Sequence, residues 1–258
     1  MIKKERPSVV VASFSWPQSL PIVIDFDSTL IKQQAFFNQF DLPVPDADQM
    51  RSIWRKHYSA IQREVAILGY DRLLMIPKGL PPLPELWQVM ARGFEPTWQG
   101  RNFQDGGSFA SVRNASSRDS SSRLVLVHGV KELDQHPVLK ATLGLSPMVL
   151  TGKSRQQIET IIRRGGNLVI NFQPSGTSTL IKAQGLTLDE YAIFQRQWLT
   201  EGDGHLDSDY WSWLLSSYSA SRLALSYWSP GSRQLDVSAG DAGGALDNLG
   251  CRLSRSFK

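Results

Sequence analysis

The C-terminal stretch "YWSPGSRQLDVSAGDAGGALDNLGCRLSRSF", residues 227–257, most constrains the fold of this chain. Residues with strong structural preferences, such as Trp228, Pro230 and Arg233, alternate there with runs of Ser, Gly, Ala and Asp. After Asp207 no apolar residue recurs at helical spacing, so short strands and turns are expected. Because clear helices precede this stretch, the sequence predicts an α+β fold rather than alternating βαβ units.

Two segments are predicted to be helices with defined ends. Between Ala47 and Leu68, apolar residues recur at spacings of four and three, and Gly69 stands where a C-terminal cap belongs. The second helix opens with the capping box Thr187-x-x-Glu190 and stops at Gly202. Shorter helices are expected at 84–92 and after the capping box Ser154-x-x-Gln157.

Short β-branched runs predict strands at 22–24, 123–129 and 167–172. Leu249–Phe257 is expected to be a closing strand, with 123–129 as its partner. A Gly- and Ser-rich stretch begins at residue 104. The predicted division is therefore an N-terminal α/β accessory region, 1–103, followed by a domain at 104–258.

Composition limits the classes of function. With 258 residues, of which 41% are hydrophobic and 20% charged, the chain can bury a core without disulfides. The net charge is +4, but the basic residues are scattered, which argues against a nucleic-acid partner. The single cysteine, Cys251, excludes an internal disulfide and is expected to be buried in a strand. With no convincing signal peptide or membrane span, a cytoplasmic protein is expected.

One motif favours an enzyme. "VIDFDSTL" resembles the first motif of haloacid-dehalogenase-like phosphatases, which implies Asp25 as nucleophile, Asp27 as general acid and a bound Mg²⁺. Thr151, Lys153, Asp203 and Asp207 would complete such a site. That chemistry needs each motif at the carboxyl end of a parallel strand, and Asp203 and Asp207 instead follow a helix. The phosphohydrolase is therefore kept as the alternative function, and the other interpretation of the two aspartates is a polar turn.

The C-terminal half resembles another family. "LTLDEYAIFQRQWLTEGDGHLDSDYWSWLLSSYSASR" and the tail pattern W-x-P-x-x-R-x-L-x-V-x-x-x-D followed by L-G-x-R-x-S-R-S-F are similar to variable proteins of diversity-generating retroelements. These are ligand-binding proteins with a C-type-lectin fold of the formylglycine-generating-enzyme type. In that family, reverse transcription with errors at adenines rewrites the 3′ end of the gene. The residues reachable at a diversified codon exclude Trp, Met, Lys, Glu and Gln.

The resemblance divides the tail into variable and scaffold positions within a variable region of about 219–248. The variable, ligand-contacting positions it implies are Ala224, Ser226, Tyr227, Ser229, Gly231, Ser232, Asp236, Ser238, Ala239, Gly240, Gly243, Gly244, Ala245 and Leu246. The scaffold positions it implies are Trp211, Trp213, Trp228, Pro230, Arg233, Asp241, Gly250 and Arg252. Trp211 and Trp213 are expected to be core residues. Arg233, Arg252 and Arg255 are expected to bond to backbone carbonyls or carboxylates.

The same resemblance implies a non-catalytic protein without a cofactor or metal. Formylglycine-generating enzymes need a cysteine pair for copper, which Cys251 alone does not provide. Sugar-binding C-type lectins use a W-N-D triplet with calcium, whereas this chain has Trp228-Ser229-Pro230. The expected partner is a macromolecule, a protein rather than a nucleic acid or a membrane. Its identity and the oligomeric state of the chain are left open.

Overall fold

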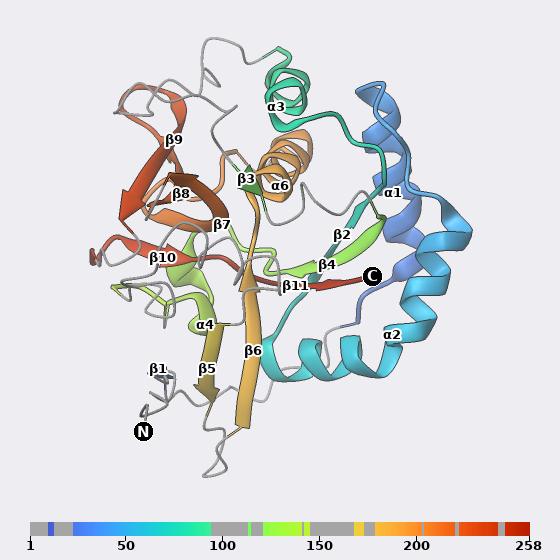
Figure 1. The fold of residues 1–258 in the computed structure, drawn as a ribbon, viewed down its shortest axis with the longest axis horizontal. Coiled ribbons are helices and arrows are strands. Elements are labelled where there is room, and N and C mark those ends of the chain that lie inside the picture. The colour runs from blue at the N-terminus through green and yellow to red at the C-terminus, as the bar shows by residue number, and fades with distance from the viewer. Residues whose placement is uncertain are drawn as a thin grey trace, which may run out of the picture.

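The computed structural model describes residues 10–12, 23–93, 113–114, 121–140, 142–144, 168–172, 179–202, 204–219, 222–241 and 246–258. These residues form a mixed α+β structure with two sheets and five α-helices (Figure 1). The predicted fold class is thus confirmed at the level of α+β.

Two helices begin the described N-terminal part, α1 (Phe26–Gln39) and α2 (Ala47–Leu68). The bounds of α2 agree with the prediction, because Asp46 caps its first turn and Gly69 closes it with φ 69°. The strand predicted at 22–24 is wrong for its described residues, since 23–25 form no strand. Asp25 instead accepts the Ser28 N–H at 3.0 Å and caps α1.

The larger sheet is six-stranded, in the order β1-β5-β6-β11-β4-β2. Its strands are β1 (Val10–Ala12), β2 (Arg72–Ile76), β4 (Arg123–Val127), β5 (Leu168–Phe172), β6 (Thr179–Gly185) and β11 (Leu253–Phe257). β11 pairs with β4 in antiparallel register, as predicted for the closing strand. Leu73 and Met75 of β2 face one hydrophobic core, while Leu74 and Ile76 face the other, so this strand is buried on both sides.

The helices cover these two sides. Residues of α1 and α2 fill the first core, and the second core lies beneath α3 (Leu83–Ala91) and α6 (Leu188–Thr200). Both predicted helices at these positions are confirmed, including the Thr187–Glu190 capping box. Figure 1 shows α2 on the far side of the molecule from β9 and α6 between the two sheets. The helix predicted after Ser154 lies outside the described residues.

The second sheet has the order β10-β7-β8-β9, with a fifth strand, β3 (Arg113–Asn114), beside β7. The others are β7 (Trp211–Ser219), β8 (Arg222–Ser229), β9 (Gln234–Asp241) and β10 (Leu249–Cys251). β10 and β11 are separated only by Arg252, so the chain passes from one sheet into the other at this residue. A short 3₁₀ helix, η3 (Leu133–Gln135), and α4 (Pro137–Lys140) lie beside β10.

The predicted border at 103/104 lies outside the described residues, but the parts on either side of it are packed together. β2 pairs with β4 along its whole length. Phe36 of α1 belongs to the same core as Tyr191 of α6. The described N-terminal helices therefore complete the core of the C-terminal part.

Candidate ligand-binding face

The β8–β9 hairpin carries most of the predicted variable positions. Ser226 pairs with Val237 and Tyr227 with Asp236, so side chains alternate between two faces of the hairpin. The inner face, defined here by Ala224, Ser226, Trp228, Leu235, Val237 and Ala239, packs against the core beneath α6. The outer face, defined by Leu223, Leu225, Tyr227, Asp236, Ser238 and Gly240, lies on the opposite side.

Four predicted ligand contacts are corrected by this arrangement. Ala224 and Ser226 are fully buried on the inner face, and the Ser226 hydroxyl donates to the Asp236 carbonyl at 2.9 Å. Asp236 and Ser238 are also buried, although they belong to the outer face. The resemblance of the tail implies that these four are variable positions. The alternation of side chains along β8, however, directs Ala224 and Ser226 toward the core. They are parts of the fold rather than of a free surface.

The outer face carries a pair of aromatic rings in contact, tilted by 31°. The rings of Trp211 and Tyr227 have centroids 3.8 Å apart, and both side chains are half-buried. Trp211 is therefore not the plain core residue expected, whereas Trp213 is 97% buried and is one. A Cβ on Gly240 would lie 2.7 Å from Leu225 Cδ1 and 3.0 Å from the Trp213 ring. This glycine fits its place because a side chain would overlap both neighbours.

The hairpin tip lies between β8 and β9 and is open to solvent. Pro230, Gly231, Ser232 and Arg233 are exposed, and a Cβ on Gly231 would meet nothing within 4 Å. Arg233 has φ 53°, so it shapes the turn through its backbone while its side chain stays exposed. The Ser232 N–H donates to Ser229 Oγ at 3.4 Å, a contact within the tip itself.

The remaining predicted variable positions lie near this tip, beside β10, or outside the residues that the structure describes. Ala239 and Ser229 are half-buried, and Leu246 is 61% exposed beside β10. Gly243, Gly244 and Ala245 lie outside the described residues, as does the side chain of Asp241. The exposed members of the predicted variable set are thus Gly231, Ser232 and Leu246, and Tyr227, Ser229, Ala239 and Gly240 are half-buried.

Trp228 stacks on His205 at the inner edge of the tip. Their ring centroids are 3.3 Å apart with 9° between the planes. The backbone N–H of Trp228 donates to the backbone carbonyl of Asp207 at 2.9 Å. Burial, with a smaller effect of the Lys131 charge, lowers the pKa of His205 to about 4. The stack is therefore made by a neutral imidazole near pH 7. Trp228 is half-buried and packs against the core beneath α6.

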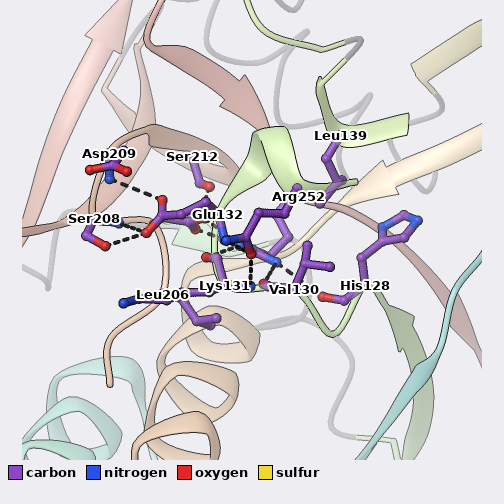
Figure 2. Close-up of polar contacts among 12 residues, drawn as sticks. His128, Val130, Lys131, Glu132, Leu139, Leu206, Ser208, Asp209, Ser212 and Arg252 are labelled. Carbon is purple, nitrogen blue, oxygen red and sulfur yellow. Dashed lines mark hydrogen bonds and ion pairs between the residues drawn. The ribbon is translucent and has the colours of Figure 1, made fainter. Parts of the chain in front are cut away.

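Behind the hairpin lies a buried polar joint between the sheets, centred on Arg252 (Figure 2). Its guanidinium donates to three carbonyls, those of His128 at 3.2 Å, Val130 at 2.8 Å and Lys131 at 3.0 Å. It also pairs with the Asp207 carboxylate, at 2.5 Å from Nη2 and 3.3 Å from Nε. Both side chains are fully buried. The prediction that Arg252 binds carbonyls and a carboxylate is confirmed.

Asp207 and Glu132 extend the joint to the strands. Asp207 also accepts from Tyr191 of α6 at 3.2 Å and from Ser212 of β7 at 2.7 Å. Its backbone has φ 54°, a conformation that non-glycine residues seldom adopt. The Glu132 carboxylate accepts the N–H groups of Ser208 at 2.9 Å and Asp209 at 3.1 Å, as Figure 2 shows. The segment that leads into β7 is thereby fixed from both sides.

Close packing around β10 completes the joint. A Cβ on Gly250 would lie 2.9 Å from both Leu133 Cδ1 and Thr142 Oγ1, which explains the glycine at this scaffold position. The Cys251 N–H donates to Thr142 Oγ1 at 2.8 Å. Cys251 is buried as predicted, and burial raises the pKa of its thiol to about 12. An inert thiol at the joint agrees with a structural rather than a reactive cysteine.

The structure does not bring the phosphatase residues together. Asp25 caps α1, and Asp27 is exposed and pairs with Arg51 at 3.2 Å. Asp207, assigned to the metal in that alternative, is neutralised by Arg252 in the buried joint. Thr151, Lys153 and Asp203 lie outside the described residues. Within the described part of the chain, no group of three or more His, Cys, Asp or Glu side chains could hold a metal.

Sequence reasoning missed the partners of Arg252. The sequence suggests Asp207 as a metal ligand or as a partner of the His205 ring and Tyr191 as part of an apolar helix face, and it suggests no contact of Arg252 with either residue. Arg252 lies 45 residues from Asp207 and 121 or more from the three carbonyls, so no local pattern joins them. The available signal was Arg252 itself, an arginine next to a buried strand that requires acceptors.

Comparisons with protein-family models, with curated proteins and with solved structures gave no match to this chain. In the described part of the chain, no helix combines the length and the apolarity needed to cross a bilayer.

Proposed function

We propose that this chain is a non-catalytic binding protein of the kind encoded by diversity-generating retroelements, with a C-type-lectin-like domain that displays a variable surface. Its ligand is a macromolecule, a protein in our proposal. The variable surface comprises Ser229, Gly231 and Ser232 of the hairpin tip, Leu246 and the accessible side of Tyr227, and Trp211, Pro230 and Arg233 are scaffold residues beside it. Ala224, Ser226, Asp236 and Ser238 are excluded from it because they are buried.

One observation carries the proposal: within the tail, the residues that hold the fold together are separate from the residues that are exposed to solvent. Arg252, Trp213 and Gly250 are buried and tightly packed, whereas Gly231 and Ser232 project into open space. A surface can accept many substitutions only if the stability of the fold resides elsewhere. The half-buried aromatic pair adds large contact groups of the type that dominates protein interfaces.

The phosphohydrolase alternative has less support. Its nucleophile, Asp25, accepts a backbone N–H as a helix cap and follows no strand among the described residues. Phosphatase activity that disappears in Asp25→Asn would restore this alternative.

The test of the proposed function is sequencing of the gene's surroundings and of the tail in independently grown populations. We expect a nearby reverse-transcriptase gene and a near-identical repeat of the tail-coding sequence. Differences between repeat and gene should occur at adenines of the repeat and should fall in codons such as those of Ser229, Ser232 and Leu246. The absence of both the repeat and the reverse-transcriptase gene would refute diversification.

A further inference from the structure

Two histidine rings lie against the buried joint. His128 is fully buried, and its ring centroid lies 4.1 Å from that of His136, which lies between η3 and α4. The His128 carbonyl accepts from Arg252, and its Nε2 lies 2.8 Å from the Leu68 carbonyl. His136 Nδ1 accepts the Val138 N–H at 3.2 Å, so this nitrogen is unprotonated. The pair thus connects the end of α2 with the segment beside β10.

The charges around the pair do not favour a proton on either ring. Arg252, from the β10–β11 junction, is the cation that acts on both rings. The ring centroid of Tyr70, a neutral side chain, lies 4.6 Å from that of His128. The carboxylates of the adjoining segments are engaged elsewhere. Asp207 binds Arg252, Glu132 binds the N–H groups of 208 and 209, and Asp71 accepts the Gly129 N–H. The remaining charged groups on this segment, Lys131, Asp134 and Lys140, are exposed.

Burial and Arg252 both lower the pKa of the imidazoles. The pKa of His136 falls to about 4, and that of His128 falls well below its ordinary value, with the neighbouring His136 contributing. If the joint opened, both rings would be exposed to water and their pKa would return to the ordinary value near 6.5. The closed form therefore requires two neutral rings, and protonation favours the open form.

We propose that the His128–His136 pair makes the joint an acid-sensitive latch. Protonation of the paired rings beside Arg252 releases residues 128–140 and Thr142 from β10 and loosens the support of the β8–β9 hairpin. The latch is closed above about pH 6.5 and opens progressively as the pH falls toward 4. Each imidazole changes the ratio of open to closed protein by up to about tenfold per pH unit in this window. This inference does not depend on the proposed function.

The single cysteine of the chain reports on the latch. Cys251 precedes Arg252 and is buried; its backbone N–H donates to Thr142 of the segment that would be released, and its thiol lies 3.8 Å from the Trp213 carbonyl. Labelling of the full chain with dipyridyl disulfide, which also reacts with thiols in mild acid, measures its exposure. We expect protection at pH 7.5 and at least tenfold faster labelling at pH 5, after correction for the rate of a free cysteine. Far-UV circular dichroism should show that helices and strands persist at pH 5.

Three substitutions locate the response. His136→Gln, which keeps a polar group but takes up no proton, should reduce the acid-induced increase severalfold. His57→Gln on α2 should leave it unchanged. His205 is the matched control, since burial also lowers the pKa of this ring to about 4, but it stacks on Trp228 outside the pair. His205→Gln should likewise leave the increase intact.

Continued protection of the wild-type thiol at pH 5 would overturn the proposal. So would equal acid-induced labelling in wild type and His136→Gln, or suppression by His205→Gln alone. If His136→Gln fails to fold, imidazole proton NMR of the wild-type chain decides. Three of its four histidines, His128, His136 and His205, must then titrate well below 6.5 in the folded protein, and titration of His128 and His136 near 6.5 would refute the latch.

Discussion

The hairpin tip and the joint belong to the same C-terminal tail but are held in different ways. At the tip, Ser232 bonds to Ser229 within the turn, and its side chain faces solvent. At the joint, Arg252 binds partners from two other segments, and no part of its side chain is exposed. A change at the tip therefore alters one turn, whereas a change at the joint affects every segment that converges on Arg252.

This difference shows where the tail can tolerate diversity. Polar residues at the joint are stable only in a complete network, because a buried charge without its partner is strongly unfavourable. Polar residues at the tip are hydrated and need no particular partner. Ala224 and Ser226 on the inner face of the hairpin are buried like the joint, although they are as small as Gly231 and Ser232 at the tip. Burial, rather than residue type, therefore separates the positions that tolerate substitution from those that do not.

The largest expected effect is at the joint. Arg252→Met removes the guanidinium and leaves the Asp207 carboxylate as an uncompensated buried charge. We expect the free energy of unfolding to fall by about 3–5 kcal/mol, measured by urea denaturation followed through tryptophan fluorescence. The double variant Arg252→Met/Asp207→Leu should recover part of this loss, since it buries no charge.

The matched control is a surface pair. Arg51 and Asp27 are 3.2 Å apart, and their side chains are 43% and 73% exposed, so Arg51→Met should lower the free energy of unfolding by less than about 1 kcal/mol. A loss for Arg252→Met no greater than that for Arg51→Met would contradict the description of the joint. An additive double variant would likewise show that Arg252 and Asp207 are not coupled.

A smaller effect is expected on the hairpin itself. Gly240→Ala places a methyl group 2.7 Å from Leu225 Cδ1, and Ala224→Phe adds a ring to a fully buried site. Each should lower the free energy of unfolding by about 1–3 kcal/mol because the core must shift to admit the new atoms. Alanine and phenylalanine are not among the residues that adenine-directed diversification excludes. Unchanged urea midpoints would show that these positions tolerate diversity after all.

Local signals in the sequence predicted the regular elements well. The apolar stripe and Gly69 fixed the bounds of α2, and the Thr187–Glu190 box fixed the start of α6. The pairing of β11 with β4 was also predicted, although the predicted strand, 249–257, is divided at Arg252 into β10 and β11. These elements depend on neighbours in the chain or on simple strand patterns, which a single sequence displays.

Long-range contacts account for what the sequence did not predict. "IVIDFD" has strand-like composition, but Asp25 caps a helix whose buried Phe26 and Leu30 pack on the first core. Ala224 and Ser226 look like bland filling until the register of β8 turns them toward α6. The joint depends on contacts between residues more than 40 positions apart, such as Arg252 with Asp207. Tertiary packing decided each of these cases.

The smallest effect on stability is expected at the tip. Gly231→Ala is the matched counterpart of Gly240→Ala, because its new methyl group would meet nothing within 4 Å. It should change the free energy of unfolding by no more than about 0.5 kcal/mol, and so should Ser232→Tyr. If the tip contacts the ligand, Ser232→Tyr should nevertheless change affinity severalfold in a binding titration, since an exposed aromatic residue adds contact area. A cost at Gly231 equal to that at Gly240 would remove the distinction between display and support on which the proposed function depends.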